Sequence, residues 1–191
     1  MNNLHRIFIA INLPENIKLE FARFQDFWPR LPARWTKKEN LHVTVDFLGN
    51  ANDQEVKEIC DIAIETAKRH GSFDLWFDRV VFGPLGKMPP RMVWATGKKS
   101  EELGALRRDL ANSLYEFAGA DSNGGDICFA PHVTLARIDQ SGSRQMEIEE
   151  IPMIDEKINN VFLVESIELM ESELRRGGPQ YTVLESVKLG G

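Results

Sequence analysis

The spacing of apolar residues near the start of the chain changes from that of a strand to that of a helix. Arg6–Leu13 (RIFIAINL) is rich in β-branched and aromatic residues, which predicts a strand. Pro14 follows it and suits the first turn of a helix. We expect this helix to end before Pro29 and Pro32. Its apolar residues recur at helical spacing: Ile17, Phe21, Phe24 and Trp28.

A second strand and a second helix follow. Leu41–Leu48 has the composition of a strand. Asn52 can cap the next helix, and Glu55, three residues later, can complete a capping box. The apolar stripe of this helix consists of Val56, Ile59, Cys60, Ala63 and Ala67.

The rest of the chain predicts one further helix and five strands. Leucines at helical spacing, followed by Phe117, mark the helix: Leu103, Leu106, Leu110 and Leu114. The strands are expected over Phe73–Phe82, Met92–Thr96, Phe129–Arg137, Val161–Met170 and Tyr181–Leu189. A loop (GADSNGGD) precedes the third of these strands, and a polar, mobile segment follows it, from Asp139 to about Glu150. Several strands are neighbours in sequence, which favours an α+β fold with largely antiparallel sheets. We expect residues 1–191 to form one domain with two similar lobes.

One short motif occurs twice. HVTV begins at His42 and HVTL begins at His132, so two of the four histidines share the same context. Side chains alternate along a strand, so each histidine shares a face with the threonine two residues later. The aliphatic residues take the other face and can enter the core. We therefore expect His42, Thr44, His132 and Thr134 to face one cleft.

This set of side chains suits displacement at phosphorus. Such a reaction needs a base on the entering oxygen and an acid on the leaving oxygen. Histidine can serve as either near neutral pH, and threonine hydroxyls can hold the non-bridging oxygens. No metal ion or other cofactor is required. The sequence contains neither an HExxH metal motif nor the GxSxG motif of serine hydrolases.

Composition limits the kind of partner. The chain has 191 residues and a formal net charge of -6, so it has no global basic field for nucleic acid. Positive charge beside a phosphate would have to be local. Cys60 and Cys128 lack metal-type spacing and suit a reducing compartment. With neither a secretory segment nor a membrane-length apolar run, we expect a cytoplasmic protein. We also expect a monomer with no obligate protein partner.

The two motifs and their surroundings resemble the 2H phosphoesterase superfamily. The resemblance is greatest to the RNA 2′,3′-cyclic phosphodiesterases, also called 2′-5′ RNA ligases, and covers nearly the whole chain. It rests on RIFIAINLP, ENLHVTVDFLG, RMVWATG, FAPHVTLAR and the closing VESIELMES and YTVLESVKL. It implies a bilobal α+β fold, in which two pseudo-symmetric lobes of antiparallel sheet, flanked by helices, surround a central cleft.

The resemblance also implies an activity, the opening of an RNA 2′,3′-cyclic phosphate to a 2′-phosphate. It implies that His42 protonates the departing 3′ oxygen and that His132 takes a proton from water. Thr44 and Thr134 would bind the phosphate. The residues alone leave the acid and the base interchangeable, because the two motifs are chemically alike.

Other residues near the motifs are candidates for substrate binding. Arg137 matches the arginine that closes the family's second motif, although strict alternation turns it away from His132 unless the strand bulges. Phe8 is expected to line the cleft, with core packing as the alternative. Phe47 occupies the position equivalent to Arg137 and could stack on a base or enter the core. Trp94 is expected in the core.

Charged residues add further candidates. Alternation places Asp46 on the face of His42, where its carboxylate would repel a phosphate or raise the pKa of His42. Several basic residues could contact phosphate or simply be solvated: Arg34, Lys37, Arg91, Arg175 and Arg176.

Three alternatives to RNA-end hydrolysis remain open. The same acid and base could join a 2′,3′-cyclic phosphate end to a 5′ hydroxyl. The substrate could be a small cyclic phosphate derived from a nucleotide or from ADP-ribose. The fold could also serve as a non-catalytic RNA- or nucleotide-binding module, although both motifs keep their histidine and threonine. The acidic net charge favours recognition of an RNA end or a small molecule over broad RNA binding.

Overall fold

The computed structural model describes residues 4–86, 89–118, 129–139, 152–176 and 178–190. Within them lie nine strands, three α-helices and two 3-10 turns. The strands are β1 (Leu4–Asn12), β2 (Ala33–Trp35), β3 (His42–Asn52), β4 (Phe73–Gly83), β5 (Met92–Gly97), β6 (His132–Ile138), β7 (Asp155–Val164), β8 (Ser166–Arg175) and β9 (Gly178–Lys188). The helices are α1 (Glu15–Ala22), α2 (Asp53–Ala67) and α3 (Glu101–Ala118), and the turns are η1 (Arg23–Asp26) and η2 (Lys38–Asn40).

These strands form one antiparallel sheet with two equivalent halves. The order is β7-β4-β5-β6-β3-β1-β8-β9, and β2 pairs with β6 beside this path. The halves meet where β3 pairs with β6 through Val43 and Val133, whose side chains are fully buried. Outward from this junction, β3-β1-β8-β9 corresponds to β6-β5-β4-β7. This arrangement confirms the predicted α+β fold with two pseudo-symmetric lobes of antiparallel sheet.

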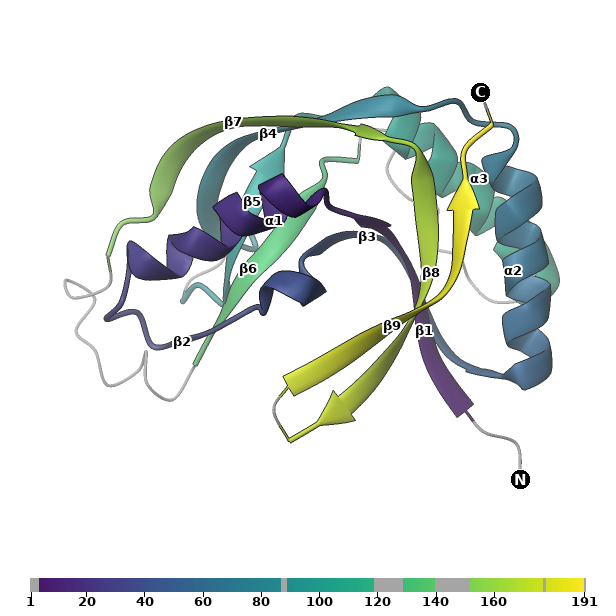
Figure 1. The fold of residues 1–191 in the computed structure, drawn as a ribbon, viewed down its shortest axis with the longest axis horizontal. Helices are drawn as coiled ribbons and strands as arrows, with labels where there is room; N and C mark the ends of the chain where they lie inside the picture. The colour runs from purple at the N-terminus through teal and green to yellow at the C-terminus, as the bar shows by residue number, and fades with distance from the viewer. Residues whose placement is uncertain (1–3, 87–88, 119–128, 140–151, 177, 191) are drawn as a thin grey trace.

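The lobes do not coincide with the two halves of the chain. Helix α1, from the first half, packs on the lobe of β4 and β7, where Phe21 meets Phe77 at 5.7 Å between ring centroids. The Asn160 side chain of β7 also donates to Glu20 of α1 at 2.7 Å. Helices α2 and α3 lie side by side on the other lobe (Figure 1). Each lobe therefore depends on segments that are distant in sequence.

A local signal explains where helix α2 begins, whereas the end of helix α1 differs from the prediction. The predicted capping box of α2 is present: Asn52 accepts from the backbone of Gln54 and Glu55, and Glu55 accepts from the backbone of Asn52. Such a cap stabilises a helix by about 1 kcal/mol. Helix α1 ends at Ala22 and continues as η1, earlier than predicted. The predicted apolar residues beyond it, Phe24 and Trp28, are nevertheless buried.

The C-terminal third corrects the prediction in one respect. The single strand expected over Val161–Met170 is two strands, β7 and β8, separated at Glu165. Here the chain leaves β4 in one lobe and joins β1 in the other. Because neither glycine nor proline marks the break, alternation alone does not reveal it. The short strand β2 was not predicted either.

Some predictions fall on parts of the chain that the structure does not describe. Four of these predictions lie outside the described residues: the loop GADSNGGD, the segment from 140 to about 150, Cys128 and the Phe117 side chain.

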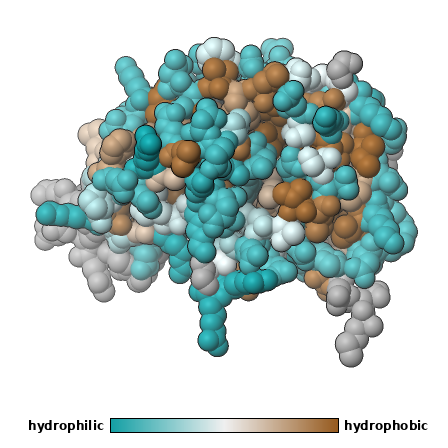
Figure 2. All heavy atoms as spheres, viewed as in Figure 1, coloured by the Kyte–Doolittle hydropathy of each residue, from teal (hydrophilic) through white to brown (hydrophobic). Residues whose placement is uncertain are grey.

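On the face seen in Figure 2, hydrophobic residues form separate groups among hydrophilic ones. Among the described residues, we find no helix with the length and hydropathy needed to cross a membrane.

Candidate active site

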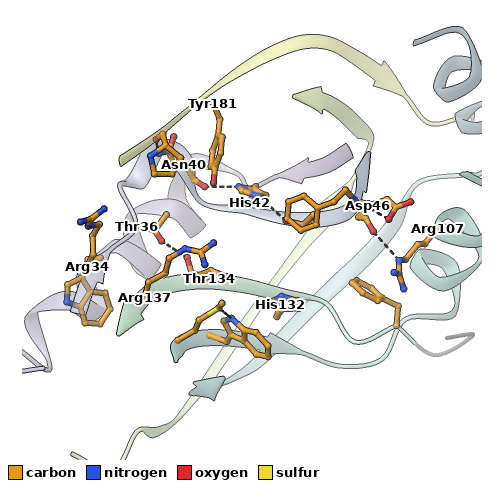
Figure 3. Close-up of a pocket in the computed structure, with 18 residues that line it drawn as sticks. Arg34, Thr36, Asn40, His42, Asp46, Arg107, His132, Thr134, Arg137 and Tyr181 are labelled. Atoms are coloured by element: carbon orange, nitrogen blue, oxygen red, sulfur yellow. Dashed lines mark hydrogen bonds between the residues drawn. The ribbon is translucent and has the colours of Figure 1, made fainter. Parts of the chain in front are cut away.

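A cavity of about 380 Å³ lies at the junction of the two lobes. His42 and Thr44 line it from β3, and His132 and Thr134 line it from β6. Arg137 lies further along β6 and also lines it. Figure 3 shows Arg34 and Arg137 on one side of the two histidines and Asp46 and Arg107 on the other. The structure thus brings together both histidines, both threonines and Arg137, all of which the sequence suggested for catalysis or substrate binding.

The antiparallel junction explains why the two motifs meet. Val43 is paired directly with Val133, so the flanking residues on each strand lie opposite one another. His42 therefore lies next to Thr134, and Thr44 lies next to His132. The arrangement has a local two-fold relation, in which each lobe supplies one histidine and one hydroxyl.

Two hydrogen bonds fix the His42 ring. Its Nδ1 lies 2.7 Å from the carbonyl oxygen of Asn40, and its Nε2 lies 3.0 Å from the Thr44 hydroxyl. A carbonyl only accepts, so Nδ1 carries a hydrogen and donates it to Asn40. In the neutral imidazole, Nε2 is then the acceptor of the Thr44 hydroxyl. Rings of Phe8 and Tyr181 pack against His42, each with a centroid separation of 5.1 Å.

His132 is held in an equivalent way. Its side chain is hydrogen-bonded to the backbone of Ala130, two residues earlier, as His42 is to Asn40. The Trp94 indole lies against it, with ring centroids 4.3 Å apart. Trp94 in turn lies against Gly83, where an added Cβ would come within 2.3 Å of the indole. The absence of a side chain at Gly83 is thus what lets the indole support His132.

Burial lowers the pKa of both histidines. Desolvation disfavours the charged imidazolium and is the main cause in each case. For His42, the positive charges of Lys18, His132 and Arg137 lower the pKa further, whereas the bond to Asn40 opposes the shift. Asp46 is not among the groups that shift the pKa of His42, and the net shift is downward, so the increase expected from Asp46 is not found. Both rings favour the neutral form near pH 7 in the absence of substrate.

Two matching β-bulges turn the residues after each motif towards the cavity. In β6, Thr134 and Ala136 pair with consecutive residues of β5, and Leu135 between them has no partner there. This bulge restores Arg137 to the face of His132, which strict alternation would have prevented. In β3, Val45 is skipped in the same way between Thr44 and Asp46. Phe47 therefore shares the face of His42 and Asp46 does not, which corrects the expectation for Asp46 from strict alternation.

The equivalent positions Phe47 and Arg137 give the cavity two different sides. Phe47 lines the cavity and is 70% exposed, so it is not a core residue. Arg137 is exposed on β6 and brings a positive charge near His42. The site therefore departs from two-fold symmetry at this pair, with an aromatic ring on one lobe and a guanidinium on the other.

Two aromatic residues lie differently from what the sequence suggested. Phe8 does not line the cavity: it is 2% exposed and packs behind His42. Its expected place as a cleft-lining residue is therefore corrected to a support for the His42 ring. Trp94, which was expected in the core, is only partly buried, lines the cavity and contacts His132.

Other lining residues carried no signal of their own in the sequence. Tyr181 comes from β9 and packs edge-on against His42. Arg107 of α3 donates to the carbonyl of Val45 at 3.1 Å and lies over the Phe129 ring. A basic residue on a mostly polar helix face is normally solvated. Only the packing of α3 against β3 brings Arg107 to the cavity.

Asp46 faces the same side of the cavity as Arg107. Burial raises the pKa of the Asp46 carboxyl, and the charge of Arg107 and a hydrogen bond from the Phe47 backbone partly oppose this.

Within the described ranges, no three His, Cys, Asp or Glu side chains gather as a metal-binding group. The cavity instead offers two imidazoles, hydroxyl donors and guanidinium groups, which suit the binding of an anion and the transfer of protons.

Comparisons with known proteins agree with this arrangement. A family model for the 2′-5′ RNA ligase superfamily matches residues 13–176. The RNA 2′,3′-cyclic phosphodiesterase of Methanocaldococcus jannaschii is 29% identical over 94% of this chain and 98% of its own length. The crystal structure of TT0787 from Thermus thermophilus superposes with a TM-score of 0.82 at 26% identity, covering 97% of this chain and 98% of that one. Escherichia coli LigT in complex with 3′-AMP gives a TM-score of 0.75 at 26% identity, covering 99% and 100%.

Proposed function

The chain belongs to the 2′-5′ RNA ligase superfamily, and from this premise we propose that it hydrolyses RNA 2′,3′-cyclic phosphate ends to 2′-phosphomonoesters. The observation that supports this most directly is the pairing of the two HVT motifs around one cavity. The relatives named as RNA 2′,3′-cyclic phosphodiesterases match this chain over nearly its whole length. We further propose that residues 1–191 act as one bilobal domain, since the catalytic pair is shared between the lobes.

The proposed mechanism uses His132 as base and His42 as acid. His132 accepts a proton from water, and the water oxygen attacks phosphorus. The bond from phosphorus to the 3′ oxygen breaks, and His42 gives its proton to that oxygen. The product keeps the phosphate on the 2′ oxygen. The two histidines lie on opposite lobes, which suits an attacking and a leaving oxygen on opposite sides of phosphorus.

The remaining groups stabilise the charge on phosphorus. The hydroxyls of Thr44 and Thr134 donate to the non-bridging oxygens, and the Arg137 guanidinium supplies a positive charge beside them. Because these donors come from two strands fixed at the Val43–Val133 junction, they need little rearrangement as the reaction proceeds. The same acid and base, exchanging roles, could join a cyclic phosphate end to a 5′ hydroxyl, whereas water at ~55 M favours hydrolysis.

Product analysis tests the proposed function. A short RNA ending in a 2′,3′-cyclic phosphate is incubated with the protein in EDTA, and phosphorus NMR identifies the product. We expect a 2′-phosphate to accumulate at a rate that EDTA does not change, because no step is assigned to a metal ion. A 3′-phosphate would reverse the identity of the leaving oxygen. No turnover of the RNA, together with turnover of a small cyclic phosphate, would contradict RNA as the substrate.

The pH dependence of kcat/KM should be bell-shaped, with its maximum below pH 6.5. The profile reports the pair of histidines in the free protein, and burial lowers the pKa of both from 6.5. Above the maximum, kcat/KM should fall about tenfold per pH unit as the acid loses its proton. Bound phosphate stabilises the imidazolium, so the maximum of kcat should lie at higher pH. A maximum of kcat/KM above pH 7.5 would contradict the assignment.

Lys18 offers a matched pair of variants for this profile. Its positive charge lowers the pKa of His42, so Lys18→Met should move the alkaline limb to higher pH. Lys38→Met removes a lysine that is paired with Glu15 and does not act on His42, so its profile should match that of the wild type.

A further inference from the structure

Two arginines face each other at one side of the cavity. Arg34 of β2 is the direct cross-strand partner of Arg137 of β6, and side chains at such positions project from the same face of a sheet. Figure 3 shows both on the side of the cavity away from Asp46 and Arg107. In the described ranges, neither guanidinium takes part in an ion pair. Like charges directly opposite each other are destabilising, so this pair is poised to receive an anion.

Strand β2 is held rigidly enough to place Arg34. The Thr36 backbone donates to the carbonyl of Leu135 at 2.8 Å, and the Thr36 hydroxyl donates to the carbonyl of Thr134 at 2.8 Å. At the other end of β2, the Asp139 backbone donates to the carbonyl of Pro32 at 2.8 Å. Both ends of the short strand are therefore fastened to the strand that contains His132.

A second hollow begins where the first cavity ends. Arg34 and Arg137 line both of them. The second hollow has a volume of about 580 Å³, and the rest of its lining is Pro32, Ala33, Ile138 and Asp139. The two arginines thus stand on the path from the histidines to an open, partly apolar hollow. A substrate longer than one nucleotide could follow this path out of the site.

We propose that Arg34, together with Arg137, binds the first phosphodiester upstream of the cyclic phosphate, so that the protein selects RNA ends over single nucleoside cyclic phosphates. This proposal rests on the proposed function. The reacting phosphate lies between the histidines, the next phosphate meets Arg34, and Arg137 lies where both phosphates can reach its guanidinium. The penultimate nucleoside occupies the second hollow. A guanidinium binds a phosphate by paired hydrogen bonds, and the two arginines supply local positive charge in a chain whose net charge is -6.

The same features limit the subsite to one phosphate. Arg34 and Arg137 are the basic residues in the described lining of the second hollow, so a second upstream phosphate would meet no further positive charge there. The chain as a whole has a net charge of -6, which opposes extended contact with RNA. A dinucleotide should therefore gain nearly all the available affinity, and a longer RNA should gain little more.

The experiment compares kcat/KM for three substrates: a nucleoside 2′,3′-cyclic phosphate, a dinucleotide with the same cyclic end, and a hexanucleotide. In the wild type, we expect the dinucleotide and the hexanucleotide to exceed the single nucleotide by about ten- to hundredfold, the effect of one hydrogen bond to a charged group. Arg34→Ala should abolish this advantage and leave the single nucleotide within about twofold of its wild-type value. It should also reduce the dependence of log kcat/KM on log salt by about 0.7 for the dinucleotide.

Two further variants sharpen the comparison. Arg34→Lys keeps the charge but not the paired hydrogen bonds, so it should restore part of the advantage. Arg23→Ala removes an arginine of η1 that is also exposed and lies outside both hollows, and it should leave all three substrates unchanged. Equal losses on single nucleotide and dinucleotide in Arg34→Ala would overturn the proposed subsite. So would a wild type that does not prefer the dinucleotide. If the wild type hydrolysed none of the three, the proposed function itself would fall.

Discussion

Replacing either His42 or His132 with alanine should lower kcat on an RNA 2′,3′-cyclic phosphate by about 10²–10⁴-fold, the usual contribution of one positioned acid or base. Both rings line the cavity between the lobes, and each is anchored to the backbone two residues earlier. Because one histidine must give a proton while the other takes one, the loss of either interrupts the same step. Single-turnover rates of hydrolysis provide the measurement.

The double variant, with both His42 and His132 replaced by alanine, tests whether the two histidines act as a pair or contribute to catalysis independently. Groups that act as a unit show strongly non-additive losses. The double alanine variant should therefore be only slightly slower than the slower single variant. His70→Ala is the matched control, because His70 is similarly shielded but pairs with Asp109 outside the cavity. A loss in His70→Ala as large as that in His42→Ala would point to a structural cause.

A substrate with sulfur in place of the 3′ oxygen tests which histidine is the acid. A thiol has a much lower pKa than an alcohol, so a sulfur leaving group depends less on protonation. If His42 is the acid, His42→Ala should recover most of its activity on this substrate, whereas His132→Ala should not. Recovery in His132→Ala alone would exchange the two roles.

The pairing of the motifs was predictable because it depends on short-range features. Alternation along a strand places His42 with Thr44 and His132 with Thr134, and both pairs line the cavity. The capping box at Asn52 is equally local and is present. These features need only the chemistry of a few consecutive residues, so one sequence suffices to find them.

The residues beyond each motif were harder to place because backbone irregularities decide their direction. The bulge at Leu135 turns Arg137 into the cavity. In the sequence, this bulge is indicated only by two consecutive apolar residues, Leu135 and Ala136. The equivalent bulge at Val45 is followed by the polar residue Asp46, so no pair of consecutive apolar residues indicates it. Strict alternation is therefore a poor guide once a strand bulges.

Long-range packing explains the remaining differences. Tyr181 and Arg34 reach the cavity from β9 and β2, whose pairing partners cannot be read from their own composition. Phe8 lies behind His42 rather than in the wall of the cavity, because Met170 and Tyr181 from β8 and β9 pack against it. The sequence likewise did not indicate that α1, from the first half of the chain, packs on the lobe of β4 and β7.

Thr44→Val should lower kcat/KM by about 10²–10³-fold, the typical cost of removing one donor to the developing charge. The structure adds a second consequence, because the Thr44 hydroxyl lies 3.0 Å from Nε2 of His42. A hydroxyl has one proton to donate. It goes to Nε2 while His42 is neutral, and it becomes free for a phosphoryl oxygen once His42 is protonated. Protonation of His42 thus prepares both the acid and the adjacent phosphate donor.

This coupling predicts a shift that a purely structural role would not produce. The Thr44 hydroxyl stabilises the neutral form of His42 by donating to it, so its removal should raise the pKa of His42. Thr44→Val should therefore move the alkaline limb of the kcat/KM profile to higher pH while lowering the maximum. Thr44→Ser, which keeps the hydroxyl, should retain both features of the wild type. Thr134→Val provides the contrast, since its loss should lower the maximum without moving that limb. If both valine variants leave the limb unmoved, the contact between Thr44 and His42 has no part in setting the proton equilibrium of the acid.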